Sequence, residues 1–331
     1  MSWRRPFTTA AALVVAASCG GGSGGLTSSP AATTGATTTT APPAVATAPP
    51  TAIGAPDTVA STGRGVVVTP SGVVVPVLAG GRGRWRVRTP CGVERTISAG
   101  KPVGGTTIVV DPGHGGSERG AISPGGLAEA AVNLAVAARV VTDLQGQGIA
   151  AVLTRTGDYD VSLTTRALIA TDLGPRALVS VHHNSQPDGP HAGPGTETYY
   201  QIASADSKRL AGLVYEEVVK ALAVYEVPWV GDTDAGAKYR PGSRGDYYAI
   251  LRQPAPLTSA LAELAFMSNP PEAALLARPD VQAVEGDAVA RGVIRWLRTA
   301  DPGSGFTTPY PRVEPPAPPG PPPPPCVDPK L

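Results

Sequence analysis

Two histidines and two glutamates are the residues of this chain best suited to chemistry. His114 lies in a glycine turn (residues 112–116) that directly follows a β-branched run, and His182 ends a second apolar run. Glu129 lies at an expected helix start, and Glu263 interrupts an otherwise apolar segment. Two imidazoles and a carboxylate are a donor set of catalytic zinc sites, and a spare carboxylate can move protons. The four residues therefore predict a hydrolytic zinc centre.

The elements that must position these residues alternate along the chain from Thr106 onward. Period-two and helical patterns, with turn and cap signals between them, divide this region into strands and helices. Strands separated by helices predict an α/β fold whose mainly parallel central sheet is flanked by helices on both faces. The expected strands are 106–110, 149–154, 177–181, 196–201 and 257–264, and the expected helices are 127–144, 162–173, 204–224 and 280–297.

This topology gives a reason for distant residues to meet. Ligands of open α/β sheets gather beyond the carboxyl ends of the strands. His114 follows the first expected strand and His182 ends the third, while Glu129 opens the helix after the first strand. We therefore expect the three side chains to converge in one crevice, with Glu263 nearby.

Each of these residues has a plainer interpretation when it is taken alone. A histidine at a strand end is usually a polar surface residue, and an acidic residue is favoured at any helix start. The glycine turn lacks the spacing of a dinucleotide-binding loop and the Gly-Lys-Ser/Thr ending of a P-loop. Glu263 is harder to dismiss, because an unpaired carboxylate in an apolar run needs a metal, a cation or solvent nearby.

Five motifs carry a resemblance to a known family. They are Val109-Val110-Asp111-Pro112-Gly113-His114-Gly115-Gly116, Leu127-Ala128-Glu129 with Asn133-Leu134, Leu153-Thr154-Arg155-Thr156, Ser180-Val181-His182-His183-Asn184, and Ala262-Glu263-Leu264-Ala265-Phe266-Met267-Ser268-Asn269. In order and spacing the chain resembles the zinc-dependent N-acetylmuramoyl-L-alanine amidases of bacterial cell-wall turnover, the amidase-3 family. The resemblance implies hydrolysis of the amide between N-acetylmuramic acid and the L-alanine of the stem peptide in peptidoglycan or muropeptides.

The resemblance also assigns roles to residues. It implies that His114, Glu129 and His182 bind Zn²⁺ and that Glu263 is the catalytic acid/base. It makes His182 rather than His183 the ligand, and leaves His183 beside the ligands or on the surface. Two further residues match family positions near the substrate, Asn184 and Arg244.

Two rival functions stay open at this point. The chain could be a catalytically silent relative that binds peptidoglycan or regulates its turnover, or a metallohydrolase of another amide, because pocket loops choose the substrate. A net charge of +1 and the lack of a basic stripe argue against nucleic-acid binding. We expect a monomer.

The N-terminus predicts export. Arg4 and Arg5 precede an apolar stretch, residues 8–17, that is too short to span a bilayer stably. Ala16-Ala17-Ser18-Cys19 resembles a bacterial lipoprotein signal, which would anchor the protein by lipid at Cys19 to the outer face of the cytoplasmic membrane. The alternatives are an ordinary signal peptide, giving a secreted protein, and a twin-arginine signal. Each places the protein in the cell envelope or outside the cell.

Composition divides the chain into five parts. Residues 1–19 are the expected signal peptide, 20–62 a disordered Gly/Thr/Ala/Pro linker, 63–103 a small β-rich segment, 104–300 the amidase catalytic domain, and 301–331 a Pro-rich tail. We expect the β-rich segment to be either an appendage packed on the catalytic domain or an SH3-like module that binds cell wall.

The two cysteines outside the signal peptide have an open role. In an oxidising compartment Cys91 and Cys326 could form a disulfide bond, and the sequence leaves this open.

Overall fold

The computed structural model describes residues 57–310 and 325–331. All of these described residues belong to one compact unit. The expected signal peptide, the linker up to residue 56 and part of the Pro-rich tail lie outside the described residues.

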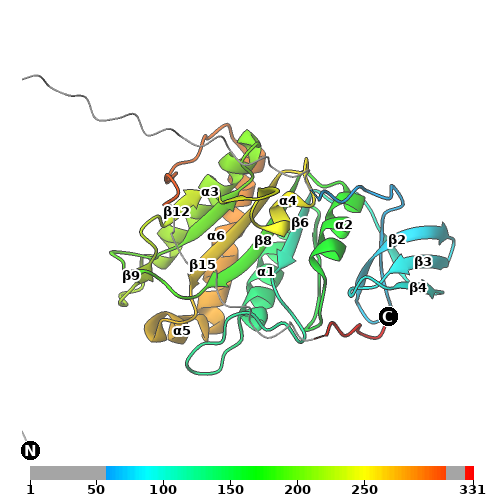
Figure 1. The fold of residues 1–331 in the computed structure, drawn as a ribbon, viewed down its shortest axis with the longest axis horizontal. Coiled ribbons are helices and arrows are strands. Elements are labelled where there is room, and N and C mark those ends of the chain that lie inside the picture. The colour runs from blue at the N-terminus through cyan, green and yellow to red at the C-terminus, as the bar shows by residue number, and fades with distance from the viewer. Residues whose placement is uncertain (1–56, 311–324) are drawn as a thin grey trace, which may run out of the picture. The chain divides into compact units, whose positions relative to one another are not determined.

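A six-stranded sheet forms the centre of the fold, in the order β12-β10-β15-β8-β6-β7 (Figure 1). Four of its five strand pairs are parallel, and β10 runs antiparallel to β15, so the sheet is mixed. The sequence analysis did not anticipate this antiparallel pair. The strands are β6 (Ile108–Pro112), β7 (Ala151–Leu153), β8 (Ala177–Asn184), β10 (Glu197–Tyr200), β12 (Gly236–Lys238) and β15 (Ser259–Phe266).

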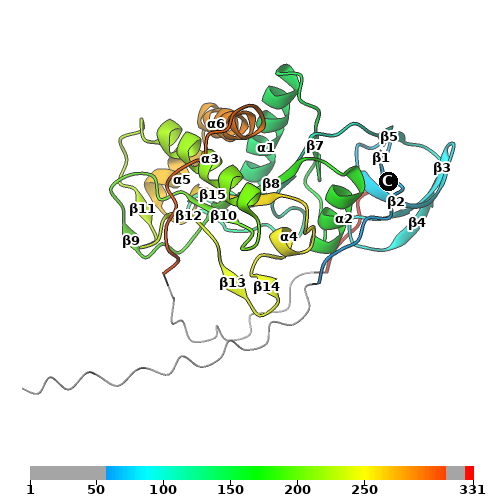
Figure 2. The ribbon, with the colours of Figure 1, turned by 90° about the horizontal axis from the view of Figure 1, so that it is seen from above.

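Helices cover both faces of this sheet, as an α/β fold requires (Figure 2). On one face, α1 (Glu129–Gly146), α3 (Ala205–Leu222) and α6 (Pro279–Arg298) enclose the main apolar core. On the other, α2 (Leu163–Leu173) and α4 (Ala249–Arg252) contribute to a smaller core. Side chains alternate across β8, so Leu178 joins the smaller core while its neighbour Val179 joins the main one.

Local capping explains where two of these helices begin. Ser162 precedes α2, and its hydroxyl accepts a hydrogen bond from the N–H of Thr165 (3.2 Å). Ser204 caps α3 in the same way through the N–H of Ser207 (3.1 Å). The helix α5 (Pro270–Leu276), which the sequence analysis did not predict, begins with proline in its first turn.

Residues 66–103 form a separate five-stranded antiparallel sheet in the order β4-β3-β2-β1-β5. Five strands therefore make up the segment that was expected to be β-rich, and β5 forms one edge of the sheet. This sheet packs against α2, where Val66 and Val74 contact Ile169. Its strands are β1 (Val66–Val68), β2 (Val74–Gly81), β3 (Arg84–Arg88), β4 (Glu94–Ile97) and β5 (Lys101–Val103).

Both described parts of the expected tail pack against folded elements. Residues 325–331 return to the small sheet, where Cys91 and Cys326 form a disulfide bond and Leu331 packs beside its apolar core. Further back, Phe306 pairs with β12 and lies edge-on to Tyr200. These described residues of the Pro-rich tail therefore make tertiary contacts.

Four two-residue strands complete the described structure, and they are too short to leave a periodic pattern. They are β9 (Gly189–Pro190), β11 (Val230–Gly231), β13 (Pro241–Gly242) and β14 (Gly245–Asp246), paired β9 with β11 and β13 with β14. Among the described residues, no helix combines the length and apolar character needed to cross a membrane.

Loss of the disulfide bond is expected to destabilise the fold. The bond closes a loop of 235 residues, and removing a native disulfide typically costs about 2–5 kcal/mol of unfolding free energy. We expect Cys91→Ser/Cys326→Ser to unfold at lower urea concentration than the oxidised parent. The reduced parent is the control and should match the variant. Equal midpoints for oxidised parent and variant would contradict this prediction.

Candidate active site

His114, Glu129 and His182 meet at the carboxyl ends of β6 and β8 and the start of α1. Each offers one ligand atom, and these atoms lie within 4.8 Å of one another. Glu129 lies between the imidazoles: its Oε2 is 3.1 Å from Nε2 of His114, and its Oε1 is 3.1 Å from Nδ1 of His182. The two rings are 4.8 Å apart and nearly perpendicular. The structure thus brings the three sequence-predicted ligands together.

Two glycines allow this close approach. A Cβ atom at Gly113 would lie 2.1 Å from the His182 ring, and one at Gly120 would lie 2.4 Å from Oε2 of Glu129. Neither position can carry a side chain without displacing a cluster residue. His114 itself has φ 60°, a left-handed conformation that is uncommon for a residue with a side chain and that the surroundings must enforce.

Glu129 is buried and held by several donors. Its Oε2 accepts a hydrogen bond from the N–H of Ala121 (2.9 Å), and its Oε1 accepts one from the N–H of His183 (3.1 Å). The side-chain amide of Asn133, one turn further along α1, donates to the same Oε1 (3.1 Å). The carboxylate is therefore fixed in position before any ligand is considered.

A carboxylate that the sequence analysis missed orients His114. Glu118 hydrogen-bonds Nδ1 of His114, which leaves Nε2 directed at Glu129. Carboxylates commonly fix the ring orientation and tautomer of metal-binding histidines in this way. The available signal was weak, because an acidic residue four positions after a histidine is ordinary in a loop.

Two buried arginines hold the backbone of the glycine turn. Arg155 donates to the carbonyl oxygens of Pro112 (3.0 Å) and Gly113 (2.9 Å). Arg166 donates to the carbonyl oxygens of Pro112 (2.6 Å) and His114 (2.7 Å). The turn is therefore fixed by two guanidinium groups. Each has five N–H donors in one plane and can bind several carbonyl oxygens at once.

Asp111 neutralises part of this positive charge from β6. It pairs with Arg166 (2.7 Å), accepts a hydrogen bond from Ser180 on β8 (2.7 Å) and binds the hydroxyl of Thr154. Burial acts to raise the pKa of Asp111, but Arg166 and the two hydroxyls hold that pKa below its usual value. Asp111 therefore stays charged at neutral pH.

Glu263 lies beside the cluster on β15. In register it faces His182 on β8 and Glu197 on β10, so the three residues form a row across the sheet. Its Oε2 is buried and has no hydrogen-bond partner among the described residues. Burial, followed by the nearby carboxylates of Glu129 and Glu197, raises the pKa of Glu263 well above its usual value. The structure thus presents a carboxyl oxygen with spare hydrogen-bonding capacity next to the cluster.

Asn184 ends β8 next to this row. Its side-chain amide donates to Glu197 (2.6 Å), which also accepts from the hydroxyl of Tyr199 (3.0 Å) and pairs with Lys238. Sequence reasoning did not find Glu197 because the residues that bind it come from three separate elements.

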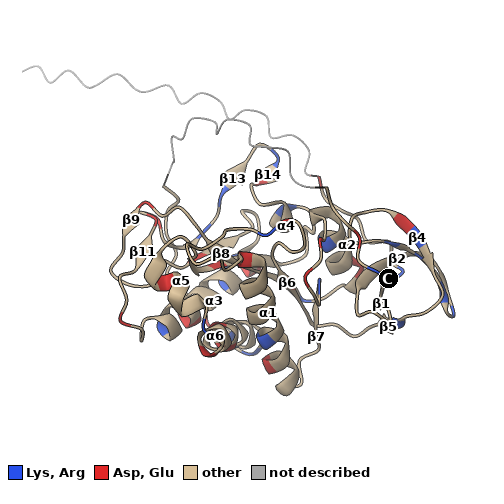
Figure 3. Ribbon diagram, turned by 90° about the horizontal axis from the view of Figure 1, so that it is seen from below, with Lys and Arg blue, Asp and Glu red and all other residues tan. Residues whose placement is uncertain are grey.

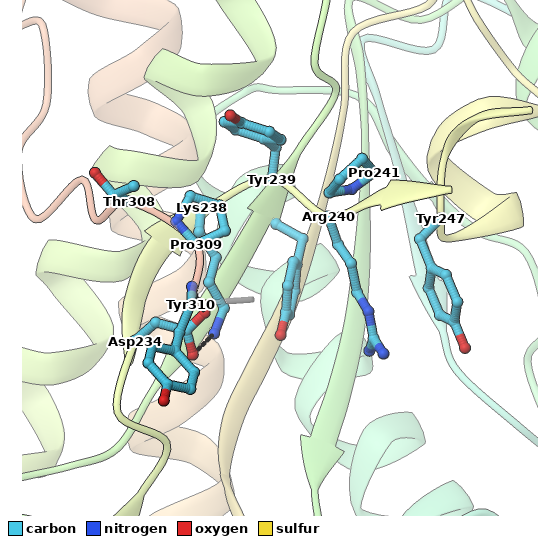
Figure 4. A pocket seen from close by; sticks show the side chains of 10 residues that line it. Asp234, Lys238, Tyr239, Arg240, Pro241, Tyr247, Thr308, Pro309 and Tyr310 are labelled. Carbon is cyan, nitrogen blue, oxygen red and sulfur yellow. Dashed lines mark hydrogen bonds and ion pairs between the residues drawn. The ribbon is translucent and has the colours of Figure 1, made fainter. Parts of the chain in front are cut away.

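A cavity of about 480 Å³ adjoins these residues (Figure 4). Arg240 and Tyr247 lie side by side in it, with the guanidinium 4.0 Å from the ring centre. Asp234 and Lys238 form an ion pair on its wall (2.7 Å). Tyr199 also lines the cavity, and its hydroxyl donates to Glu197, so one wall of the cavity is bonded to the row that contains Glu263.

Arg244, predicted to lie near the substrate, occupies the turn between β13 and β14. It is exposed, and its guanidinium pairs with Asp57 (2.9 Å). Asp57 also pairs with Arg252, and this bond, with Arg244 contributing, lowers the pKa of Asp57 to about 2. Arg244 therefore pairs with Asp57, in the segment that precedes the small sheet.

The sequence analysis expected His183 either beside the ligands or on the surface, and it does not lie on the surface. It points to the face of the sheet opposite His182 and is fully buried. Its Nδ1 is 2.7 Å from Oδ1 of Asn133, and its Nε2 is 3.3 Å from Oε2 of Glu285 on α6. Because Asn133 also binds Glu129, His183 belongs to a polar chain beneath the cluster.

Comparison with known proteins identifies the family. Residues 108–295, more than half of the chain, match the amidase-3 sequence model, described as N-acetylmuramoyl-L-alanine amidase. The chain belongs to the amidase-3 family. It is thus an enzyme of the N-acetylmuramoyl-L-alanine amidase type, and the matched region contains all three cluster residues and Glu263.

Two of the three proteins compared next, LytC and AmiC2, are named N-acetylmuramoyl-L-alanine amidases. The amidase-family chain is 33% identical over 215 residues to the YqiI protein of Bacillus subtilis (strain 168), covering 63% of this chain and 95% of that protein. It is 34% identical over 199 residues to the amidase LytC of the same organism, covering 60% of this chain but 36% of LytC. The solved structure of the amidase AmiC2 of Nostoc punctiforme has a TM-score of 0.50 and 30% identity, covering 59% of this chain and 99% of that one.

The buried pair His183–Glu285 yields a prediction about stability. Breaking a buried pair leaves a carboxylate without its partner and typically costs about 3–5 kcal/mol, whereas replacing both members with apolar residues is often neutral. We expect His183→Leu to lower the unfolding free energy by that amount and His183→Leu/Glu285→Leu to recover at least half of the loss. Urea denaturation of both variants measures this. Costs that simply add in the double variant would show that the pair is not coupled.

Proposed function

We propose that this amidase is a zinc-dependent hydrolase that cleaves the amide between N-acetylmuramic acid and L-alanine in peptidoglycan during cell-wall turnover. One observation carries the proposal: two imidazoles and a carboxylate converge within 4.8 Å, and beside them lies a second carboxyl oxygen that finds no hydrogen-bond partner in residues 57–310 and 325–331. This combination suits metal-assisted hydrolysis, in which three protein ligands hold the metal and a separate group moves protons.

The donor set fits zinc. His114, Glu129 and His182 provide nitrogen and oxygen ligands of the kind found in catalytic zinc sites, and Glu118 supports His114 from behind. Zinc bound there would supply Lewis acidity, which polarises a carbonyl group and makes water more acidic.

The other residues take roles that follow from their positions. Glu263 accepts the proton of the attacking water and returns it to the leaving amine of L-alanine. Asn184, at the end of β8, is proposed to contact the substrate next to the scissile amide. Arg244 is proposed to bind a more distant part of the substrate when its ion pair with Asp57 opens.

The proposal predicts different outcomes for the two glutamates. Glu129→Gln should lower zinc content and activity together, because it alters a ligand. Glu263→Gln should keep zinc and the folded core but lose about 10²–10⁴-fold in turnover, the usual effect of removing a positioned acid/base. The measurement pairs metal analysis with mass spectrometry of muropeptide digests, with and without a chelator.

Several results would contradict this division of roles. Loss of zinc in Glu263→Gln with retention in Glu129→Gln would mean that the roles are reversed. Intact muropeptides with the zinc-loaded parent would indicate a silent relative, and cleavage of a different amide would indicate another metallohydrolase. Chelator-resistant cleavage would remove the zinc dependence.

We also propose that the enzyme is exported and anchored to the outer face of the cytoplasmic membrane by lipid at Cys19. The support is the sequence Ala16-Ala17-Ser18-Cys19, in which small residues precede a cysteine.

Cys19→Ser should move the protein from the membrane fraction to the soluble fraction. The acyl chains attached at this cysteine would provide the anchor, since stable anchoring needs more than one chain and lipoproteins carry several. Unchanged fractionation, measured by immunoblot with a known lipoprotein as control, would favour a plain signal peptide.

A further inference from the structure

Positive charge is concentrated in the small sheet. Of the 27 Lys and Arg side chains in the protein, seven lie between residues 63 and 103, and of the 26 Asp and Glu side chains only Glu94 does. The rest of the chain therefore carries more acidic than basic groups. Figure 3 marks these cationic positions in blue on the strands around β2 and β4. The whole chain has a net charge of only +1, so this excess of cations is local.

The cations form a regular row on β3. Trp85 and Val87 point into the core of the small sheet, so Arg84, Arg86 and Arg88 point to the other face. Alternate residues of a strand are separated by about 6.4–6.8 Å, which spaces the three guanidinium groups evenly. We call Arg84, Arg86 and Arg88 the arginine row. The side chain of Arg86 is 58% exposed and that of Arg88 33% exposed.

The neighbouring acid neutralises little of this charge. Glu94 on β4 lies 3.6 Å from Arg86 and 3.9 Å from Arg88, and both contacts are at the surface, where ion pairs contribute little. Among the described residues, Arg84 forms no ion pair. Three guanidinium groups therefore share one carboxylate, and the row keeps a net positive charge that is open to a partner.

We propose that the arginine row binds a linear phosphodiester polymer of the cell wall. Guanidinium groups match phosphate oxygens with paired hydrogen bonds. An unbranched polymer with one phosphate in each short repeat can present its charges to successive arginines. The acidic remainder of the chain repels the same polymer, so attraction is confined to this sheet.

The composition of this face favours a polymer over a membrane. Peripheral membrane surfaces combine cations with large apolar side chains that enter the lipid. On strands β3 and β4, the outward positions beside the arginine row are Glu94 and Thr96, which are both polar and exposed. The proposal rests on the proposed function only in placing the protein at the wall, and it does not depend on hydrolysis.

The test compares two triple variants of the full-length chain with equal net charge. One is Arg84→Gln/Arg86→Gln/Arg88→Gln, and the matched control is Lys220→Gln/Arg278→Gln/Arg298→Gln, which removes three exposed cations from the catalytic fold. Binding is measured by calorimetry with lipid-free poly(glycerol phosphate). We expect the first variant to bind at least about tenfold more weakly and the control to stay within about twofold of the parent.

Salt dependence gives a second measurement. Each lost phosphate contact should reduce the slope of log affinity against log salt by about 0.7–0.9, so removal of the row should reduce it by about 2–3. A single charge reversal, Arg86→Glu, should weaken binding as well, and this variant leaves the other two arginines in place. Cleavage of soluble muropeptides at the parent rate would show that each variant is folded.

The outcomes separate this proposal from the proposed function. Equal loss of binding in both triple variants, or in neither, overturns the arginine row as the site. Binding to phosphatidylglycerol vesicles without binding to the polymer also overturns it in favour of a membrane. If the parent binds the polymer through the row but leaves muropeptides intact, the row stands and the amidase mechanism fails; thermal unfolding then replaces cleavage as the check on folding.

Discussion

The active site depends on two guanidinium groups buried beneath the glycine turn. Arg155 and Arg166 are almost fully buried, and burial of a charge is costly unless every donor finds an acceptor. Here the carbonyl oxygens of residues 112–114, at the end of β6 and in the turn after it, accept four of these hydrogen bonds. The turn thus satisfies the arginines, and the arginines fix the turn. His114 can then be held in its left-handed conformation without freedom to relax.

This constraint extends from the turn to the rest of the site. Arg155 also donates to the carbonyl oxygen of Ala130 in the first turn of α1 (2.7 Å), so the same group positions the helix that carries Glu129. Asp111 joins Arg166 to Ser180 on β8, the strand that carries His182. The three cluster residues therefore share one buried polar network, although they belong to three different elements.

The sequence was sufficient for those parts of the site that follow from topology. Strand ends in an α/β sheet converge at one edge, so the meeting of His114 with His182 was predictable from two apolar runs. The antiparallel direction of β10 was not predictable, because the direction of a strand depends on the path that the chain takes between strands. Likewise, Arg155 was visible in a motif, but nothing in its neighbours indicates that it is buried. The family resemblance distinguished His182 from His183, but the buried position of His183 on the opposite face follows only from the alternation of side chains across β8.

The end of the chain ties the small sheet to the same turn. Oδ1 of Asp160 accepts hydrogen bonds from the N–H and hydroxyl of Ser117, three residues after His114, while Oδ2 accepts one from the N–H of Val327. Val327 follows Cys326, whose disulfide bond reaches the loop after β3. A continuous series of bonds therefore joins the strand of the arginine row to the loop that carries His114. A polymer held by that strand would have a fixed relation to the cluster, which a flexibly linked binding module could not provide.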